Sequence, residues 1–179
     1  GWCDWSSDVC SSDLLFNIDQ KADVISKKEI DALLAVFVKV FNESCGYYGK
    51  LGHVAQFERD LVKRGLYDDF KKAYREIAEK DWLDGREETA LEKKNISWAY
   101  AKATGNSADE TTDIIGNYRA DYAMSIEDFA GMINEYIQSR GKDFRLNFFV
   151  DEVGQYIADN VKLMTNLQTI AESLATKCK

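Results

Sequence analysis

At residues 144–154 the chain reads FRLNFFVDEVG, an apolar run that ends in two adjacent carboxylates and then a glycine. Its β-forming residues predict a strand that is buried on both faces, as the strands of parallel sheets are. Open parallel sheets bind ligands at the carboxyl ends of their strands, which is where Asp151 and Glu152 stand. The stretch therefore predicts an α/β protein with a ligand site at this strand end.

A shorter apolar run, LFNID at residues 15–19, also ends in an acid. Two such runs on either side of a helical region predict neighbouring strands of one parallel sheet. Asp19 is therefore a weaker candidate for the same site, because an acid at this position could equally cap the loop that follows.

Most of the remaining chain predicts amphipathic helices. Ser26 and Glu29 form a capping box before a helix whose apolar stripe runs from Ile30 to Phe41. Further helices are expected before Gly65, around residues 70–77, over residues 86–104, after a second capping-box pattern at 107–110, from Ser125 to Gly141, and over roughly residues 156–176. A single βαβ crossover needs far fewer residues, so we interpret residues 45–141 as a helical insertion on an α/β core.

Two stretches resemble one protein family. Residues 144–179, FRLNFFVDEVGQYIADNVKLMTNLQTIAESLATKCK, resemble the Walker B region of the large P-loop ATPase of BREX bacteriophage-resistance systems (the BrxC/PglY family). Residues 15–43, LFNIDQKADVISKKEIDALLAVFVKVFNE, resemble an earlier part of the same family. The similarity extends from Leu15 to Lys179 and implies a partial P-loop NTPase (AAA+-like) core with parallel strands and a large, mainly α-helical insertion.

The resemblance implies roles for the two acids. Asp151 would be the cofactor-binding and metal residue, supporting the Mg²⁺ that accompanies ATP, and Glu152 would be the catalytic residue that positions and activates the attacking water. In the family, the Gly-rich phosphate loop would precede Leu15. ATP and Mg²⁺ are therefore expected as cofactors of the complete parent protein, and none is expected for this piece alone.

Residues 4–14, DWSSDVCSSDL, match the translation of a common sequencing-adapter oligonucleotide. We interpret residues 1–14 as a non-native, disordered tail and exclude it from the fold. The expected organisation is then this tail, a first core strand and helix at 15–44, the helical insertion at 45–141, and the Walker B-like strand with its helix at 142–179.

Without the acids of that tail the net charge of −8 becomes −5, and two isolated cysteines remain, Cys45 and Cys178. Isolated cysteines are typical of a reducing compartment, and no apolar run is long enough to cross a bilayer, so a cytoplasmic protein is expected. A mildly acidic chain is a poor nucleic-acid binder by itself. The resemblance implies partners within the parent complex: other BREX proteins, DNA, and further copies of the parent.

Other chemistries find less support. The loop GYYGKLG at residues 46–52 lacks the spacing of a phosphate-binding loop and predicts a turn. His53 is the only histidine, which excludes a two-histidine metal site or a Ser-His-Asp triad within the chain. Two alternatives stay open: a metal-dependent hydrolase that uses Asp19, Asp151 and Glu152 as oxygen ligands, and a non-catalytic helical interaction module.

Overall fold

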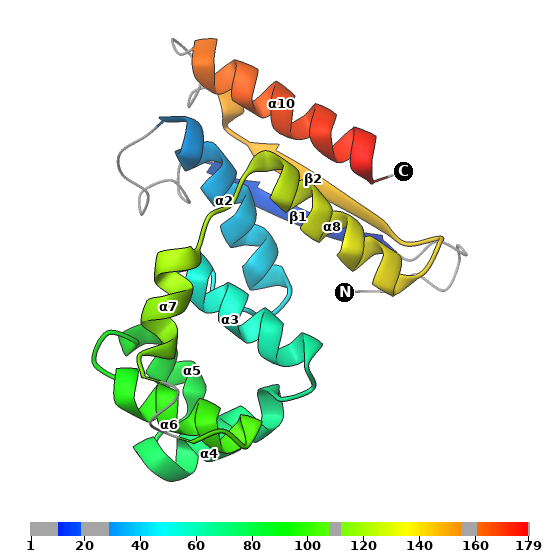
Figure 1. The fold of residues 1–179 in the computed structure, drawn as a ribbon. Coiled ribbons are helices and arrows are strands. Elements are labelled where there is room, and N and C mark those ends of the chain that lie inside the picture. The colour runs from blue at the N-terminus through cyan, green and yellow to red at the C-terminus, as the bar shows by residue number, and fades with distance from the viewer. Residues whose placement is uncertain (1–10, 19–28, 108–111, 155–160, 179) are drawn as a thin grey trace. The chain divides into compact units, whose positions relative to one another are not determined.

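The computed structural model describes residues 11–18, 29–107, 112–154 and 161–178 (Figure 1). The chain divides into two compact units, residues 1–44 with 124–179 and residues 45–123. The first unit holds β1 (Ser11–Asn17), α2 (Glu29–Ser44), α8 (Ile126–Arg140), β2 (Arg145–Asp151) and α10 (Val161–Lys177). The second holds α3 (Gly52–Lys63), α4 (Tyr67–Ala78), α5 (Trp82–Gly85), the 3₁₀ turn η1 (Arg86–Glu88), α6 (Lys93–Thr104) and α7 (Ile114–Asp121).

The two strands lie side by side and run parallel. Their register extends from Ser11 opposite Arg145 to Asn17 opposite Asp151. This confirms the prediction of neighbouring parallel strands, and β2 coincides with the predicted apolar run. β1 begins at Ser11, so residues 11–14, which were expected to be part of a disordered tail, lie in the strand.

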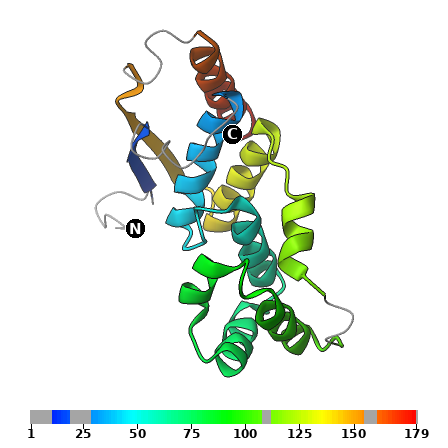
Figure 2. The ribbon, with the colours of Figure 1, turned by 90° about the vertical axis from the view of Figure 1, so that its left-hand side faces the viewer.

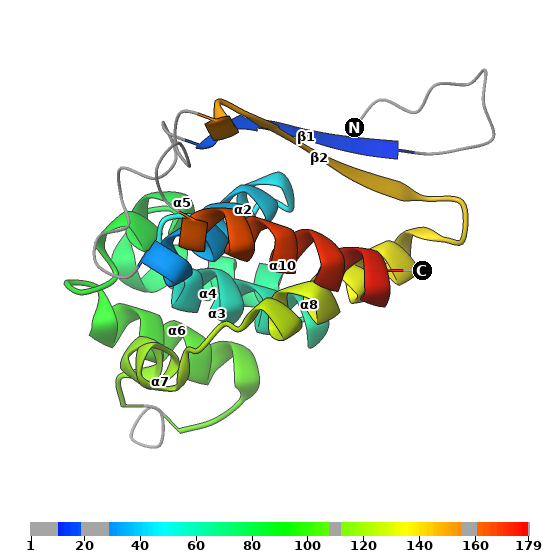
Figure 3. The same cartoon turned by 90° about the horizontal axis from the view of Figure 1, so that it is seen from above.

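Helices α2, α8 and α10 lie on one side of this sheet, as Figures 2 and 3 show. The contact is aromatic: the ring centroid of Phe37 lies 5.3 Å from that of Phe16 and 5.6 Å from that of Phe148. On the other side, Leu15 is 77% exposed and Phe149 is 51% exposed. The prediction that β2 is buried on both faces is therefore wrong, because only its alternate side chains meet the described helices.

Helix α8 begins as predicted. Ser125 accepts a hydrogen bond from the amide of Asp128, and the Asp128 carboxylate accepts one from the amide of Ser125. Phe129 of this helix is buried against Phe37 and Phe41, at centroid distances of 6.4 Å and 6.2 Å. Because α8 packs in this way, it belongs to the unit with the sheet, and the separate helical unit ends at residue 123 instead of the expected 141.

Two helices differ in detail from the expectation. In α10 the buried side chains are Leu163 and Ile170, whereas Val161 and Met164, expected to face inward, are 80% and 60% exposed. Successive residues point roughly 100° apart around a helix, so a stripe through Leu163 and Ile170 leaves Met164 outside it.

The capping residue Ser26 and the site candidate Asp19 lie outside the described residues.

The helix expected over residues 86–104 is interrupted. The chain forms η1 and a turn, and α6 starts only at Lys93. The carboxylate of Glu92, just before this start, accepts hydrogen bonds from the Tyr74 hydroxyl at 2.9 Å and the Asn95 amide at 2.8 Å, and pairs with Lys80 at 2.7 Å. These contacts hold the segment in place, and the sequence periodicity does not reveal them.

The second unit is built around aromatic rings and one buried acid. Phe57, Phe70 and Trp82 pack edge to face at centroid distances of 5.1 to 6.1 Å. Beside them Glu58 is fully buried and accepts hydrogen bonds from several donors: the amide of Tyr48 at 2.6 Å, the indole of Trp82 at 2.7 Å, the hydroxyl of Tyr67 at 3.0 Å and the guanidinium of Arg86 at 3.1 Å. Residues 46–52 follow helix α2, and the amide of Tyr48 donates to Glu58, which confirms the predicted turn.

Candidate functional site

The carboxyl ends of β1 and β2 bring three polar side chains together. Asn17 is the register partner of Asp151, and Glu152 follows directly after β2. The parallel pairing causes this proximity, because parallel strands end at the same edge of a sheet. Asp151 and Glu152 therefore stand at the strand end that the sequence predicted.

Glu152 leaves the strand in an unusual backbone conformation. Its φ is +58°, in the left-handed region that residues other than glycine seldom adopt. Its amide donates a hydrogen bond to Oδ1 of Asp151 at 2.8 Å, so the two acids are linked through the turn. Non-glycine residues held in this region cluster at functional sites, where the surrounding structure maintains the geometry.

Asn17 orients the second acid. Its side-chain amide nitrogen donates a hydrogen bond to the carboxylate of Glu152. Both acids are exposed to solvent, as a ligand site requires and as an inert strand end would also allow. The sequence analysis missed Asn17 and chose Asp19 instead. One feature of the sequence could have identified Asn17: it is a polar residue within the apolar run LFNID. The parallel register places it opposite Asp151.

The carboxylate oxygens at this edge suit a hard cation such as Mg²⁺ that also takes ligands from outside the protein. Asp151 offers carboxylate oxygens, and Mg²⁺ in nucleotide sites is bound through one or two carboxylates together with waters and phosphates. Within the described residues, no group of three or more His, Cys, Asp or Glu side chains could hold a metal ion. The hydrolase alternative also uses Asp19, which lies outside the described residues, so this search does not bear on it.

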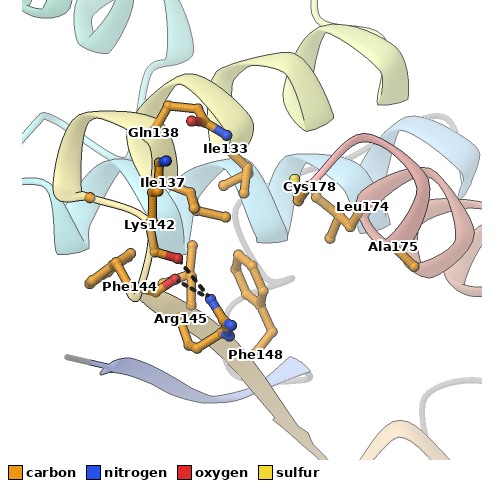
Figure 4. Close-up of a pocket in the computed structure, with 12 residues that line it drawn as sticks. Ile133, Ile137, Gln138, Lys142, Phe144, Arg145, Phe148, Leu174, Ala175 and Cys178 are labelled. Carbon is orange, nitrogen blue, oxygen red and sulfur yellow. Dashed lines mark hydrogen bonds between the residues drawn. The ribbon is translucent and has the colours of Figure 1, made fainter. Parts of the chain in front are cut away.

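A cavity of about 610 Å³ lies elsewhere in the same unit, between α8, the beginning of β2 and the end of α10 (Figure 4). Its apolar wall includes Ile133, Phe148 and Leu174, and Lys142 and Arg145 also line it. Neither Asp151 nor Glu152 contributes to it. Because β2 begins at Arg145 and ends at Asp151, the candidate acids stand at the other end of the strand.

The sequence analysis also considered His53, Cys178 and Cys45, and the structure places each of them among other protein groups. His53 is buried in α3, and its pKa is lowered because burial disfavours the charged form and Arg119 lies nearby. Burial raises the pKa of the Cys178 thiol, which lies 3.8 Å from the carbonyl oxygen of Ala130. Cys45 is half-buried.

Comparison with known proteins adds no assignment. No protein-family model matches the chain, and no solved structure matches it. In the part of the chain that the structure describes, no helix combines the length and the apolar character needed to cross a membrane.

Proposed function

We propose that this chain is an internal part of an ATP-hydrolysing P-loop protein of the BREX phage-defence type, containing the Walker B strand but not the phosphate loop. One observation carries the proposal. Two adjacent parallel strands end together at Asn17 and Asp151, and the Asn17 amide reaches across to the carboxylate of Glu152. In P-loop enzymes the acid that ends such a strand supports Mg²⁺, and a following acid can orient water.

The proposed roles follow from the position of each group. Bound Mg²⁺ would neutralise charge on the phosphates, and Asp151 would hold it directly or through water. Glu152 would position and activate the attacking water, and the hydrogen bond from Asn17 fixes where its carboxylate stands. The left-handed backbone conformation of Glu152 supports this assignment, because non-glycine residues held in that conformation cluster at functional sites.

The proposal also includes the setting. We infer a cytoplasmic protein that works with other BREX proteins and with DNA through the parent complex, as a homo-oligomer of the parent. This chain by itself should not bind ATP, because phosphates are held mainly by backbone amides and a lysine of the Gly-rich loop.

A pair of measurements tests the proposal. A fluorescent ATP analogue with Mg²⁺ is titrated against this chain and against a longer product in which the native sequence of the parent gene replaces residues 1–14. The proposal expects no binding to this chain and tight binding to the longer product. Tight binding to this chain, or no Gly-rich loop encoded upstream, would contradict it.

One observation favours a second candidate, the helical interaction module, for the unit at residues 45–123. Several large apolar side chains of this unit are exposed, among them Leu91 at 83% and Trp98 at 51%. Exposed tryptophan is a frequent hot spot of protein interfaces. If this unit binds another protein of the system, Trp98→Ala weakens the complex while ATP hydrolysis by the complete protein stays unchanged.

A further inference from the structure

We infer that the outer face of α6 is a docking surface for an acidic segment of another protein. This surface, the α6 stripe, consists of Lys94, Trp98 and Lys102. The inferred partner deepens the second candidate function, the interaction module at residues 45–123, and rests on it. Docking on the α6 stripe is independent of ATP hydrolysis.

The three side chains of the α6 stripe lie on one face of the helix. They follow one another at intervals of four residues, and helical residues four apart are neighbours on the same face. All three are exposed. The other side of the helix is buried through Ile96 and Ala99, which belong to the aromatic core of the unit. The core therefore anchors α6, and the helix presents the stripe to solvent.

Trp98 is the apolar centre of the stripe. The other tryptophan of this unit, Trp82, is buried, and its indole donates to Glu58. Trp98 is 51% exposed, and within the described residues it has no hydrogen bond and no aromatic partner. A tryptophan side chain contributes most when its ring is buried and its N–H finds an acceptor, and tryptophan is enriched among interface hot spots. A partner that covers Trp98 gains both contributions.

The two lysines determine which partner fits. Lys94 lies one turn before Trp98 and has no ion pair or hydrogen bond in the described part of the chain. Lys102 lies one turn after Trp98 and pairs with the exposed carboxylate of Glu76 on α4, a contact that a carboxylate of the partner can share. Ammonium groups on both sides of the ring complement a segment with carboxylates on both sides of an apolar side chain.

A hollow beside the stripe gives the partner a place for a further side chain. It has a volume of about 410 Å³ and lies between α4 and α6, where the small side chains of Ala73 and Ala103 leave room. Lys102 lines this hollow as well as the stripe. One segment can therefore cover Trp98 and enter the hollow together.

Two other occupants are disfavoured by charge. If a second copy of the stripe packed against the first at Trp98, Lys94 would face a lysine whether the helices ran parallel or antiparallel, and like charges in an interface repel. A nucleic acid needs clustered cations along its phosphates, whereas the carboxylates of Asp69 and Glu76 line the adjacent hollow. An acidic protein segment is the occupant that remains.

The test selects peptides from a displayed random library with the 179-residue chain as bait. Peptides that also bind Trp98→Ala are removed. The peptides that remain should carry Asp or Glu on both sides of an apolar residue. Measured by fluorescence anisotropy, Trp98→Ala should weaken their binding at least about tenfold and Lys94→Glu at least about fivefold.

Charge reversal in the peptide provides the complementary measurement. A peptide whose acids are replaced by lysine should bind Lys94→Glu more tightly than it binds the unaltered chain. Lys142→Glu changes the same charge on an exposed residue outside this unit and should leave binding unaffected. Circular dichroism establishes that each variant is folded. If Lys94→Glu does not fold, the salt dependence of binding to the unaltered chain decides, because docking through charge must weaken as salt rises.

The two ways in which this can fail give different results. If no selected peptide depends on Trp98, both the interaction module and its acidic partner are overturned. If the peptides depend on Trp98 but show no excess of acids, or bind Lys94→Glu equally well, the module stands and the acidic partner is overturned. A single-stranded oligonucleotide that binds more tightly than every selected peptide also overturns the acidic partner.

Discussion

The side-chain amide of Asn17 donates a hydrogen bond to the carboxylate of Glu152, a residue 135 positions later in the chain, and so joins the carboxyl ends of the two strands. This contact restricts the orientation of an exposed acid that would otherwise be free to rotate. In the proposed ATPase, the same restriction positions the group that activates water.

Replacing Asn17 tests that role. If the parent is the proposed ATPase, we expect Asn17→Ala to lower its kcat about tenfold and to leave KM for ATP nearly unchanged, because in the proposal this side chain positions Glu152 and does not touch nucleotide. Asn17→Asp should lower kcat further, since it places a second negative charge beside Glu152. Steady-state kinetics distinguish the cases, and a rise in KM with unchanged kcat would assign Asn17 to substrate binding instead.

The two candidate strands illustrate what the sequence could provide. The apolar run before Asp151 and the parallel pairing of β1 and β2 followed from residue type and order. The contact between Asn17 and Glu152 did not, because it depends on the cross-strand register, and a shift of one residue would turn the side chain to the other face.

The helices show a similar limit. The capping box at Ser125 is local, so the start of α8 was predictable. The interruption before α6 depends on Tyr74 and Lys80, which reach Glu92 from earlier in the chain. The exposure of Phe149 was unpredictable for another reason: its residue type suits burial, and only the arrangement of the helices shows which face of the sheet they cover.

Among the acids of the second unit, Glu58 should be the one whose replacement lowers the free energy of unfolding most. Glu58→Gln leaves the guanidinium of Arg86, now 3.1 Å from the carboxylate, without its charged partner in a largely buried setting. We expect a loss of about 3 kcal/mol in the free energy of unfolding, measured by urea denaturation. The exposed Glu79→Gln is the matched control and should change stability by less than about 0.5 kcal/mol. Equal effects of the two variants would argue against the buried network.

His53 should make stability depend on pH. Its pKa in the folded protein is lowered by burial and by Arg119, so the unfolded chain binds the proton more readily. The contribution of His53 to the free energy of unfolding is then fully present above the ordinary histidine pKa of about 6.5. It is lost as the pH drops below that value toward the folded-state pKa. His53→Gln should flatten this part of the pH profile. Subtracting the two profiles removes the carboxylate contribution that both proteins share, and a difference independent of pH would contradict the assignment.

Two glycines offer a steric comparison. A methyl group on Gly85 would collide with the ring and hydroxyl of the buried Tyr74, whereas one on Gly131 in α8 would meet no atom within 4 Å. We expect Gly85→Ala to destabilise by about 1–3 kcal/mol through overpacking. Gly131→Ala should stabilise by up to about 1 kcal/mol, because alanine favours a helix interior. Thermal unfolding of both variants checks the pair, and a neutral Gly85→Ala would contradict the packing described around Tyr74.

The central claim is that the acids ending β2 serve ATP hydrolysis, and the most direct test is turnover by the complete ATPase carrying Glu152→Gln. Loss of the activating carboxylate should lower kcat by at least about 100-fold while Mg²⁺-ATP still binds. Glu172→Gln, on the exposed side of α10, is the control and should retain full activity. Unchanged turnover in Glu152→Gln would contradict the account.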